Sequence, residues 1–249
     1  MKIIGLVNVQ LAYVNNNVYL LEVNPRASRT IPFVSKALGI PLARIAAKIM
    51  AGKSLKDLKF QEIPSLEGFF VKEAVMPFNK FQNVDPILGP EMRSTGEVMG
   101  IGNSFAEAFE KAEVGAGAEI PKKGSVFISV RDTDKQFLSE IVPSLVEQDF
   151  NLFATKGTAS VIKNMGFKVS QIKKVIEGRP NIVDLMKNKE VNLVINTTEG
   201  RESILDSASI RRTALDEKIC CTTTIKGAKA ICEVITKKVD WSYRKLQDI

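Results

Sequence analysis

A stretch of nine residues near the N-terminus, Leu21–Arg29 (LEVNPRASR), combines side chains that could hold a metal-bound phosphate. In a β-strand, residues i and i+2 point to the same face, so Glu22 and Asn24 would present their oxygen atoms side by side. Arg26 and Arg29 follow directly after them. Hard oxygen ligands beside guanidinium groups suit a magnesium-bound polyphosphate. The spacing therefore predicts a site of the kind that binds Mg-ATP.

A neighbouring strand would bring a third oxygen donor to the same place. Residues 7–13 read as a strand, and the three asparagines at 15–17 are typical of a turn. If Asn16 is the centre of the hairpin, Gln10 lies directly opposite Glu22. Three oxygen donors would then converge beside the two arginines.

The composition narrows the class of protein. The chain has 249 residues, 45% of them hydrophobic and 25% charged, and a formal net charge of +7, which fits one large or two small globular domains. No apolar run approaches membrane-spanning length, and the N-terminus lacks the profile of a signal peptide. Basic residues are spread along the chain with few aromatic residues between them, so neither nucleic acid nor a membrane is expected as a partner.

Histidine and cysteine usage excludes several chemistries. The sequence contains no histidine, which rules out Ser-His-Asp and Cys-His triads and any acid–base step on an imidazole. Its three cysteines, Cys220, Cys221 and Cys232, are an odd and sparse set without the spacing of a zinc site. They indicate reduced thiols in a cytoplasmic protein.

The first part of the chain shows a mixture of elements that must position the predicted ATP site. After the hairpin, apolar periodicity predicts helices at about 30–38 and 42–51, strands at 69–78 and 93–102, and a helix at 105–112 that Ser104 caps. Residues 115–124 mix glycine, proline and lysine and are the best candidate for a linker. We therefore expect one domain over 1–114, which looks incomplete, and another over 125–249.

The second domain alternates regularly between strands and helices. Apolar runs predict strands at 126–130, 150–154, 168–172, 191–196 and 219–223, and helical patterns fill 132–148, 158–165, 181–188, 203–217 and 227–236. Five such alternations predict an α/β fold, a doubly wound parallel sheet with helices on both faces.

Ligands of such sheets bind beyond the carboxyl ends of the strands, where loops open into helix N-termini. Loops of this kind are Thr155–Thr158 (TKGT) and Asn196–Arg201 (NTTEGR), which combine glycine with hydroxyl groups. Ser129 ends the first strand, and Lys135 and Lys174 follow the first and third strands. These residues outline a cradle for a phosphate, although each hydroxyl could instead be a simple helix N-cap. The cradle has no catalytic set, so it predicts binding without transformation of the ligand.

Several runs resemble one known family. Gln10 and the run Glu22–Lys36 (EVNPRASRTIPFVSK) resemble the end of the second ATP-grasp unit in large chains of the carbamoyl-phosphate synthase family. Residues 78–81 (FNKF) and the more specific run Asp85–Gly100 (DPILGPEMRSTGEVMG) resemble the segment that follows it. Residues from Gly124 onward resemble the family's C-terminal allosteric domain, which has the fold of methylglyoxal synthase. The likeness covers nearly the whole chain in collinear order.

The resemblance implies a role for each candidate residue. Gln10 and Glu22 would contact ATP, and Gln10, Glu22 and Asn24 would hold its magnesium or manganese ions. Arg26 and Arg29 would contact the transferred phosphoryl group. The positions that bind a nucleotide effector of the UMP or IMP type would be Ser129, Lys135, Thr155, Thr158, Lys174, Asn196, Thr198 and Arg201.

The implied function is that of an ATP-dependent ligase. It makes carbamoyl phosphate from bicarbonate, ATP and glutamine-derived ammonia, for pyrimidine and arginine synthesis. The implied partners are the rest of the large chain, a glutaminase small chain and the nucleotide effector. The chain starts inside what would be the ATP-grasp domain, as its truncated end, so we expect that by itself it cannot turn over ATP.

Two alternatives and one departure accompany this interpretation. The chain could instead be a stand-alone nucleotide-sensing module without catalysis. Methylglyoxal synthase itself is excluded, because that enzyme is expected to use a histidine. Glu73 resembles a glutamate that contacts ornithine in some members of the family, but those members carry Tyr-Asp-Thr where this chain has Cys221–Thr223 (CTT), which speaks against activation by ornithine.

Overall fold

The computed structural model describes residues 2–60, 63, 65–81, 84–88, 93–237, 241, 243 and 245. Two compact units emerge from the packing: the smaller includes residues 1–67, and the larger spans residues 68–241. The predicted linker, 115–124, lies inside the larger unit. The division of the chain into domains at that linker stays a prediction.

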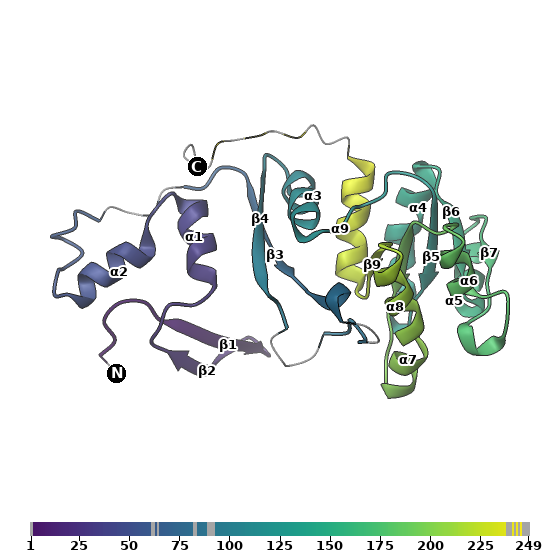
Figure 1. Ribbon diagram of the computed structural model, residues 1–249, viewed down its shortest axis with the longest axis horizontal. Helices are drawn as coiled ribbons and strands as arrows, with labels where there is room; N and C mark the ends of the chain where they lie inside the picture. Colours follow the sequence, from purple (N-terminus) through teal and green to yellow (C-terminus); the bar gives the residue numbers. More distant parts are fainter. Residues whose placement is uncertain are drawn as a thin grey trace. The chain divides into compact units, whose positions relative to one another are not determined.

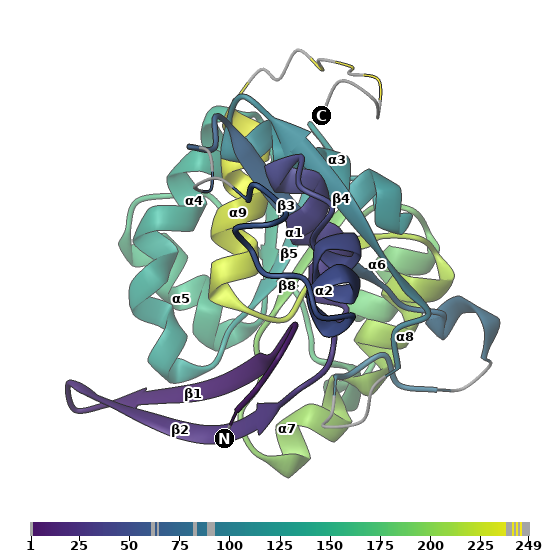
Figure 2. The same ribbon diagram turned by 90° about the vertical axis from the view of Figure 1, so that its left-hand side faces the viewer.

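The smaller unit begins with the predicted hairpin. Strands β1 (Asn8–Val14) and β2 (Asn17–Asn24) pair antiparallel, and Figure 2 shows them as one long ribbon. Asn15 and Asn16 form the turn with φ angles of 49° and 63°, the left-handed conformation that a two-residue type I′ turn requires.

The register of the hairpin confirms the prediction, although the predicted centre of the turn is wrong. Two turn residues place the centre between Asn15 and Asn16, and on that register Leu11 pairs with Leu20. A shift of one residue between Gln10 and Leu11 then puts Gln10 opposite Glu22. Such a bulge reverses which face the following side chains occupy.

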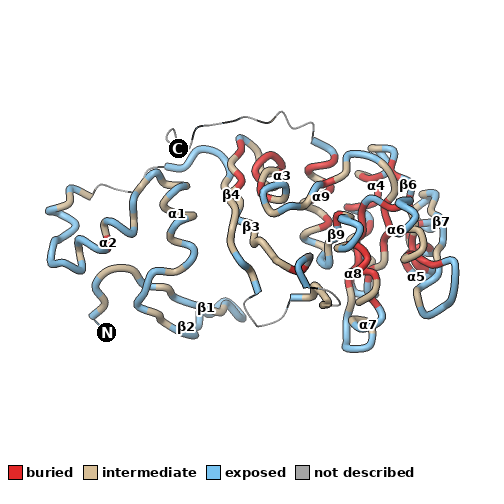
Figure 3. The backbone as a smooth tube through the Cα atoms, viewed as in Figure 1, coloured by how far each residue is buried: buried red, intermediate tan, exposed pale blue. Residues whose placement is uncertain are grey.

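Helices α1 (Thr30–Leu38) and α2 (Leu42–Met50) complete this unit as predicted. Gly39 ends α1 with a φ angle of 65°, a left-handed cap that glycine adopts without strain. Among the described residues of this unit only Ala46 is buried, and the hairpin and α2 are mostly pale blue in Figure 3. The unit therefore has little core of its own.

The larger unit opens with a two-stranded layer. Strand β3 (Phe69–Val75) pairs antiparallel with β4 (Gly96–Gly102), and a short 3₁₀ turn, η1 (Phe78–Lys80), follows β3. Helix α3 (Phe105–Ala116) packs on this pair, and the Ser104 hydroxyl accepts a hydrogen bond from the Glu107 amide as the predicted N-cap. Both strands are shorter than predicted, since β3 ends at Val75, ahead of η1, and β4 begins only at Gly96.

Helix α3 and β4 approach so closely that Gly100 has no room for a side chain. A Cβ atom there would lie 1.8 Å from the Ala108 carbonyl oxygen and 2.7 Å from the Ala112 nitrogen, whereas a Cβ at Gly96 in the same strand would meet nothing within 4 Å. Both clashing atoms belong to the helix backbone, which cannot give way without moving the whole helix.

We therefore expect Gly100→Ala to lower the free energy of unfolding by about 3 kcal/mol, because overpacking forces the layer apart. Gly96→Ala is the matched control and should change it by less than about 0.5 kcal/mol. Urea unfolding followed by the fluorescence of the single tryptophan, Trp241, measures both. Equal effects of the two substitutions would contradict the tight packing at Gly100.

The predicted parallel sheet forms the rest of the unit. Its strands are β5 (Ser125–Ser129), β6 (Asn151–Ala154), β7 (Ser170–Gln171), β8 (Leu193–Asn196) and β9 (Cys220–Thr222). They lie in the order β7-β6-β5-β8-β9, all parallel. The chain thus winds outward in one direction from β5 to β7 and in the other through β8 to β9, which makes the gap between β5 and β8 the topological switch point.

Helices follow the strands at nearly all the predicted places. They are α4 (Leu138–Glu147, after the 3₁₀ segment η2, Asp132–Phe137), α5 (Lys156–Asn164), α6 (Ile182–Lys187, after the 3₁₀ turn η3, Val175–Glu177), α7 (Arg201–Asp206), α8 (Ala208–Asp216) and α9 (Ile225–Thr236). The predicted helix 203–217 is two helices that meet at Ser207.

Both faces of the sheet are buried, as a doubly wound fold requires (Figure 1). Val126 and Ile128 of β5 pack into a cluster with residues of α4, α5 and α9. Phe127, between them in sequence, packs into a second cluster with α6 and α8. Figure 2 shows these two groups of helices on opposite sides of the sheet. The alternation of strand side chains thus builds two cores.

Buried contacts join the two-stranded layer to the parallel sheet within the larger unit. Ala106 of α3 belongs to the same buried cluster as α9. Glu110 of α3 accepts a salt bridge from Lys122 at 2.6 Å and a hydrogen bond from the Trp241 indole at 3.0 Å. The Ala106 and Trp241 contacts connect residues on either side of the predicted linker, and Lys122 belongs to the linker itself.

Candidate functional site

The hairpin brings the predicted metal ligands together. The side-chain amide of Asn24 donates a hydrogen bond of 2.8 Å to Glu22 Oε1, so the two side chains lie side by side as their i, i+2 spacing predicts. Gln10 lies opposite Glu22 on the paired strand. Because the amide of Asn24 donates through nitrogen, its oxygen stays available as a ligand. The arrangement fits a hard cation that also binds phosphate oxygens.

The two arginines follow the hairpin as predicted. Arg26 is exposed, and its guanidinium donates a hydrogen bond to the Ala27 carbonyl at 3.2 Å. Arg29 occupies the N-cap position of α1. In the part of the chain that the structure describes, no group of three or more His, Cys, Asp or Glu side chains could hold a metal without other ligands.

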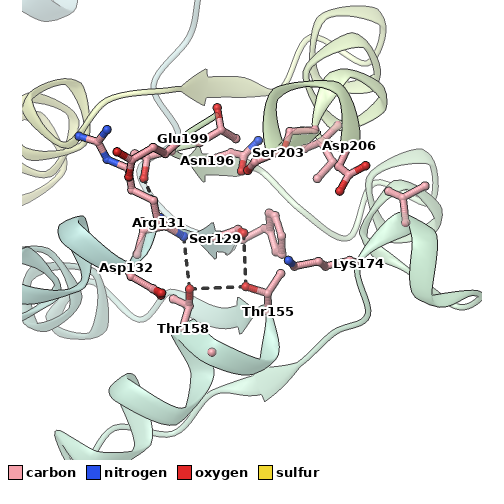
Figure 4. A pocket seen from close by; sticks show the side chains of 18 of the residues that line it. Ser129, Arg131, Asp132, Thr155, Thr158, Lys174, Asn196, Glu199, Ser203 and Asp206 are labelled. Carbon is pink, nitrogen blue, oxygen red and sulfur yellow. Dashed lines mark hydrogen bonds between the residues drawn. The ribbon is translucent and has the colours of Figure 1, made fainter. Parts of the chain in front are cut away.

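The larger unit contains a cavity of about 530 Å³ at the carboxyl ends of the parallel strands. Ser129 of β5, Thr155 after β6 and Asn196 of β8 reach it from three neighbouring strands (Figure 4). This is the switch point at which doubly wound sheets bind ligands. Seven of the eight predicted effector residues line the cavity: Ser129, Lys135, Thr155, Thr158, Lys174, Asn196 and Thr198.

The hydroxyl groups form a connected chain at the floor of the cavity. The Ser129 and Thr155 hydroxyls are 3.3 Å apart, and Thr155 donates to the Thr158 hydroxyl at 3.5 Å. Thr158 in turn accepts from the backbone amide of Val130 at 3.2 Å. Thr155 stands at the N-cap of α5 but makes no capping hydrogen bond with its side chain in the described structure. Its hydroxyl therefore faces the cavity rather than serving as a cap.

Two lysines give this floor a positive charge. Lys135 forms a salt bridge of 2.6 Å with Asp132, whose carboxylate is almost fully exposed. The Lys135 ammonium, with a smaller contribution from Lys174, lowers the pKa of Asp132. The Asp132 carboxylate thus interacts electrostatically with both lysines, and the phosphate of a ligand would do the same. A Cβ at Gly157, near the N-terminus of α5, would lie 3.1 Å from Lys135 Nζ, so glycine keeps that helix end open.

Asn196 carries an unsatisfied donor at this cavity. The residue is 1% exposed, and among the described residues its buried Nδ2 atom has no hydrogen-bond partner. An unpaired buried amide costs about 1–3 kcal/mol. Buried polar groups in native proteins are usually paired, so one that lines a cavity points to an acceptor on a bound molecule.

One predicted effector residue falls outside the cavity. Arg201 is the first residue of α7, and the cavity is lined by Glu202, Ser203 and Asp206 of the same helix. At about 100° per residue these three share one face, which leaves Arg201 well round the helix. The prediction that Arg201 belongs to this set is therefore not matched by the geometry.

The structure adds residues that the sequence reasoning missed. Arg131, Asp132, Thr197 and Glu199 also line the cavity. The Thr197 hydroxyl accepts the Arg131 amide at 3.1 Å, which ties the loops after β5 and β8 together. The carboxylates on one face of α7 could have been found from their i, i+4 spacing, but the position of that helix beside the strand ends could not.

A second cavity of about 460 Å³ lies in the same unit, between the two-stranded layer and α8. Glu73 of β3, Arg211 of α8, Cys221 and Thr223 line it. Burial, together with the nearby Glu73 carboxylate, raises the pKa of Glu113 on α3 to about 7. The second cavity thus brings together the residues that the resemblance connects with ornithine. Among them is Cys221, which stands where ornithine-responsive members of the family carry tyrosine.

Glu113 should make this unit less stable as the pH rises. Between its ordinary value of 4.5 and about 7 the folded state keeps a proton that the unfolded chain releases. Proton binding favours the folded state, so this contribution is lost as the pH rises through that window. We expect Glu113→Gln to be more stable than the wild type by about 1–2 kcal/mol at pH 8, a value reduced by solvent screening at a partly buried site.

The difference should become small at pH 4.5, where half of the unfolded chains already carry the proton on Glu113, and should vanish near about pH 3, where Glu113 is neutral in both states. Urea unfolding at several pH values measures it. Glu147→Gln, at an exposed position on α4, removes the same charge without burial and is the control. A stabilisation that is equal at pH 4.5 and pH 8 would contradict the assigned protonation.

Comparisons with known proteins agree with this architecture. The family model described as "MGS-like domain" matches residues 138–223. This range lies in the doubly wound sheet with the cavity at its strand ends, which therefore belongs to the class of MGS-like domains. Residues 1–58, which contain the hairpin and both helices, match the model described as "Carbamoyl-phosphate synthase L chain, ATP binding domain".

Whole-chain relatives are large chains of one enzyme. The carbamoyl phosphate synthase large chain of Pseudomonas aeruginosa is 56% identical over 247 residues, which cover 99% of this chain and 23% of that protein. The large chain of Pseudomonas putida gives the same values, and that of Vibrio parahaemolyticus is 49% identical over 98% of this chain and 23% of its own length. The chain belongs to the family of carbamoyl phosphate synthase large chains, and it spans less than a quarter of these relatives.

Among solved structures, a methylglyoxal synthase from Elizabethkingia anophelis aligns with a TM-score of 0.39 and 16% identity, over 45% of this chain and 79% of that one. In the described part of the chain, no helix is both long and apolar enough to cross a membrane.

Proposed function

We propose that the cavity at the strand ends of the larger unit binds a nucleoside monophosphate effector of the UMP or IMP type. The observation that carries the proposal is the buried, unpaired amide of Asn196 in a cavity that also holds two lysines. The lysines and the hydroxyl floor suit a phosphate, and the Asn196 amide suits an acceptor elsewhere on the ligand.

The cavity binds its ligand without transforming it. It contains no histidine, and Asp132 is already engaged with Lys135. Its carboxylates on α7 face a neutral part of the ligand, where they accept hydrogen bonds from hydroxyl or amino groups. Arg201 would act from outside the cavity lining.

The hairpin is proposed to contribute to an ATP site. Gln10 and Glu22 would contact the nucleotide, and Gln10, Glu22 and Asn24 would hold its magnesium or manganese ions. The metal, when bound, neutralises charge on the phosphates. Arg26 and Arg29 donate hydrogen bonds to the transferred phosphoryl group and so stabilise its negative charge.

For the whole protein we propose the activity that the name of its relatives states, carbamoyl phosphate synthesis. It is an ATP-dependent ligase that makes carbamoyl phosphate from bicarbonate and glutamine-derived ammonia, in the cytoplasm, for pyrimidine and arginine synthesis. Its partners would be the rest of the large chain and a glutaminase small chain. The exposed apolar residues of the hairpin support such partners, since Leu11, Tyr19 and Leu20 are each more than half exposed and a two-stranded hairpin is at best marginally stable alone.

A second candidate is a nucleotide-sensing module that works without catalysis. The observation in its favour is that the larger unit holds its cavity entirely by itself. ATP-dependent synthesis of carbamoyl phosphate by this chain alone would contradict the module and also our expectation that the chain cannot turn over ATP.

Calorimetry with UMP and with IMP tests the effector site. We expect one of them to bind the chain, and Lys135→Met to weaken binding by at least tenfold, because a phosphate loses one of its two cations. Asp132→Asn should tighten binding about threefold to tenfold, because it removes an anion that competes for Lys135.

Lys163→Met, which removes a charge near the end of α5 away from the cavity lining, is the control and should leave the affinity unchanged. The difference between the Lys135 and Lys163 variants distinguishes a phosphate cradle from nonspecific attraction to a basic chain, which would weaken equally on the loss of either lysine. Binding of neither nucleotide to the folded wild type would overturn the proposal.

A further inference from the structure

A buried arginine joins helix α8 to the segment that follows β3. Arg211 is 3% exposed. Its Nε donates to Asp85 Oδ1 at 2.8 Å, and one terminal nitrogen donates to Asp85 Oδ2 at 2.5 Å. The two residues are 126 positions apart in the sequence. A bidentate pair of this kind fixes both distance and orientation.

The next arginine reinforces the connection. Arg212 donates to the carbonyl of Phe81 at 2.7 Å and to that of Val84 at 3.2 Å. Asp85 also accepts the Ile87 amide at 3.2 Å. We use the term α8 clasp for Arg211 and Arg212 with the groups they hold, namely the Asp85 carboxylate and the Phe81 and Val84 carbonyls.

Helix α8 stands between the two cavities. Ser207, at its start, and Ile210 line the cavity at the strand ends. Arg211, Ala214 and Leu215 line the second cavity, together with Glu73. By rotation about the helix axis the two sets overlap, and they differ in position along it, the first set lying toward the start of α8 and the second toward its end. A displacement of α8 would therefore change the walls of both cavities.

The clasp also reaches α7, the other wall of the effector cavity. The nitrogen of Arg211 that binds Asp85 donates to the Ile204 carbonyl of α7 at 2.7 Å. None of the six residues of α7 is buried, so little core packing holds this helix. It is the part of the cavity wall that can shift at least cost.

We propose that the α8 clasp couples occupancy of the effector cavity to the segment 84–88 and the second cavity, with Arg211 as a positioning residue. A ligand that draws α7 toward the cavity moves the Ile204 carbonyl and so the guanidinium that holds Asp85. The coupling rests on the proposed function, because it needs a ligand in the first cavity. A bidentate pair with a buried guanidinium transmits such a shift better than a hydrated surface pair, which water can replace.

Hydrogen exchange of the whole chain, with saturating UMP or IMP at the concentration that calorimetry gives, tests the proposal. The Ile87 amide is the reporter, since it is bonded to the Asp85 carboxylate and lines neither wall of the effector cavity. In the wild type, nucleotide should change its exchange rate at least threefold. In Asp85→Asn this change should disappear while the dissociation constant of the nucleotide moves less than about threefold, and Asp85→Glu should restore part of it.

Asp216→Asn is the matched control, because it removes the 2.8 Å partner of Arg212 on the same helix without touching Arg211. It should keep the response at Ile87. Nucleotide binding to the wild type without a response at Ile87, or a full response in Asp85→Asn, would overturn the coupling. A merely structural role for Asp85 would not make exchange at Ile87 depend on the nucleotide.

A measurement without ligand separates this proposal from the effector site. If neither nucleotide binds, the proposed function is wrong. The positioning role of the α8 clasp is then tested by hydrogen exchange of the ligand-free protein. Asp85→Asn should then raise exchange in residues 201–206 at least threefold, because Arg211 loses its anchor, while residues 125–164 stay unchanged. No rise in α7 would overturn the clasp as the element that positions this wall.

Discussion

Asp85→Ala should lower the free energy of unfolding of the larger unit by about 3–5 kcal/mol, the range for removal of one partner from a buried ion pair. The size of the effect comes from the asymmetry of the pair. Arg211 is 3% exposed, whereas the Asp85 side chain is 28% exposed. Removing the aspartate leaves a largely buried guanidinium without its carboxylate, and among the described residues only the Ile204 carbonyl still accepts from it.

Removing the arginine should cost less. Arg211→Met keeps most of the buried volume and leaves Asp85 near enough to solvent to be hydrated, so we expect a loss of about 1–2 kcal/mol. The double variant Asp85→Ala, Arg211→Met should resemble Arg211→Met, not the sum of the two. Urea unfolding followed by Trp241 fluorescence measures all three, and additive losses would contradict a stranded charge as the cause.

The same pair should weaken in acid. Hydrogen bonding and charge from Arg211 hold the pKa of Asp85 below its ordinary value of 3.8. A carboxyl group with a lowered folded pKa contributes stability that is present above pH 3.8 and is lost as the pH falls through the folded value. The difference in the free energy of unfolding between the wild type and Asp85→Ala should therefore shrink below about pH 4 and stay constant above about pH 5.

Asn196→Leu is expected to separate ligand binding from stability. Leucine has the same number of side-chain heavy atoms but no unpaired donor, so the ligand-free protein should gain about 1–2 kcal/mol. Nucleotide affinity should fall at least tenfold, because the amide that the ligand would satisfy is gone. A gain in stability with a loss of binding is the pattern of a group that is kept for a ligand.

Thermal unfolding and calorimetry on the same samples measure the two effects. Asn196→Asp is the control, because it buries a carboxylate in place of the amide and should lose both stability and affinity. A loss of stability in Asn196→Leu would show that the Asn196 amide is satisfied in the free protein. That result would remove the observation on which the effector site depends.

Local pattern was enough for most of the secondary structure. Apolar periodicity predicted all five strands of the parallel sheet and the helices between them, because the central strands of that sheet are buried on both faces and must be apolar. The edge strand β7 is the exception, since both of its residues are exposed and polar. The hairpin was also predicted, and the position of Gln10 opposite Glu22 is confirmed. That pairing depends on a bulge between Gln10 and Leu11. The residues of the turn do not predict this bulge.

The residues of the candidate sites could be predicted from the sequence where they lie at the carboxyl ends of neighbouring strands, because such ends lie close together. Ser129, Thr155 and Asn196 end neighbouring parallel strands, so the topology alone brings them to one cavity. Arg201 shows the limit of this reasoning. Its loop was correctly placed, but the angle at which α7 presents its side chains depends on how that helix packs. The carboxylates of α7 enter the cavity for the same reason and were missed.

The sequence by itself determined the elements, the two kinds of site and the family, because periodicity, hydroxyl-glycine loops and the run Asp85–Gly100 are local properties of the chain. Only the tertiary structure decided which surfaces meet. Nothing in the sequence connects Asp85 with Arg211, and their pairing across 126 positions arises from the packing of α8 beside the two-stranded layer. The unpaired amide of Asn196 is likewise a result of burial, and burial depends on everything that folds around a residue.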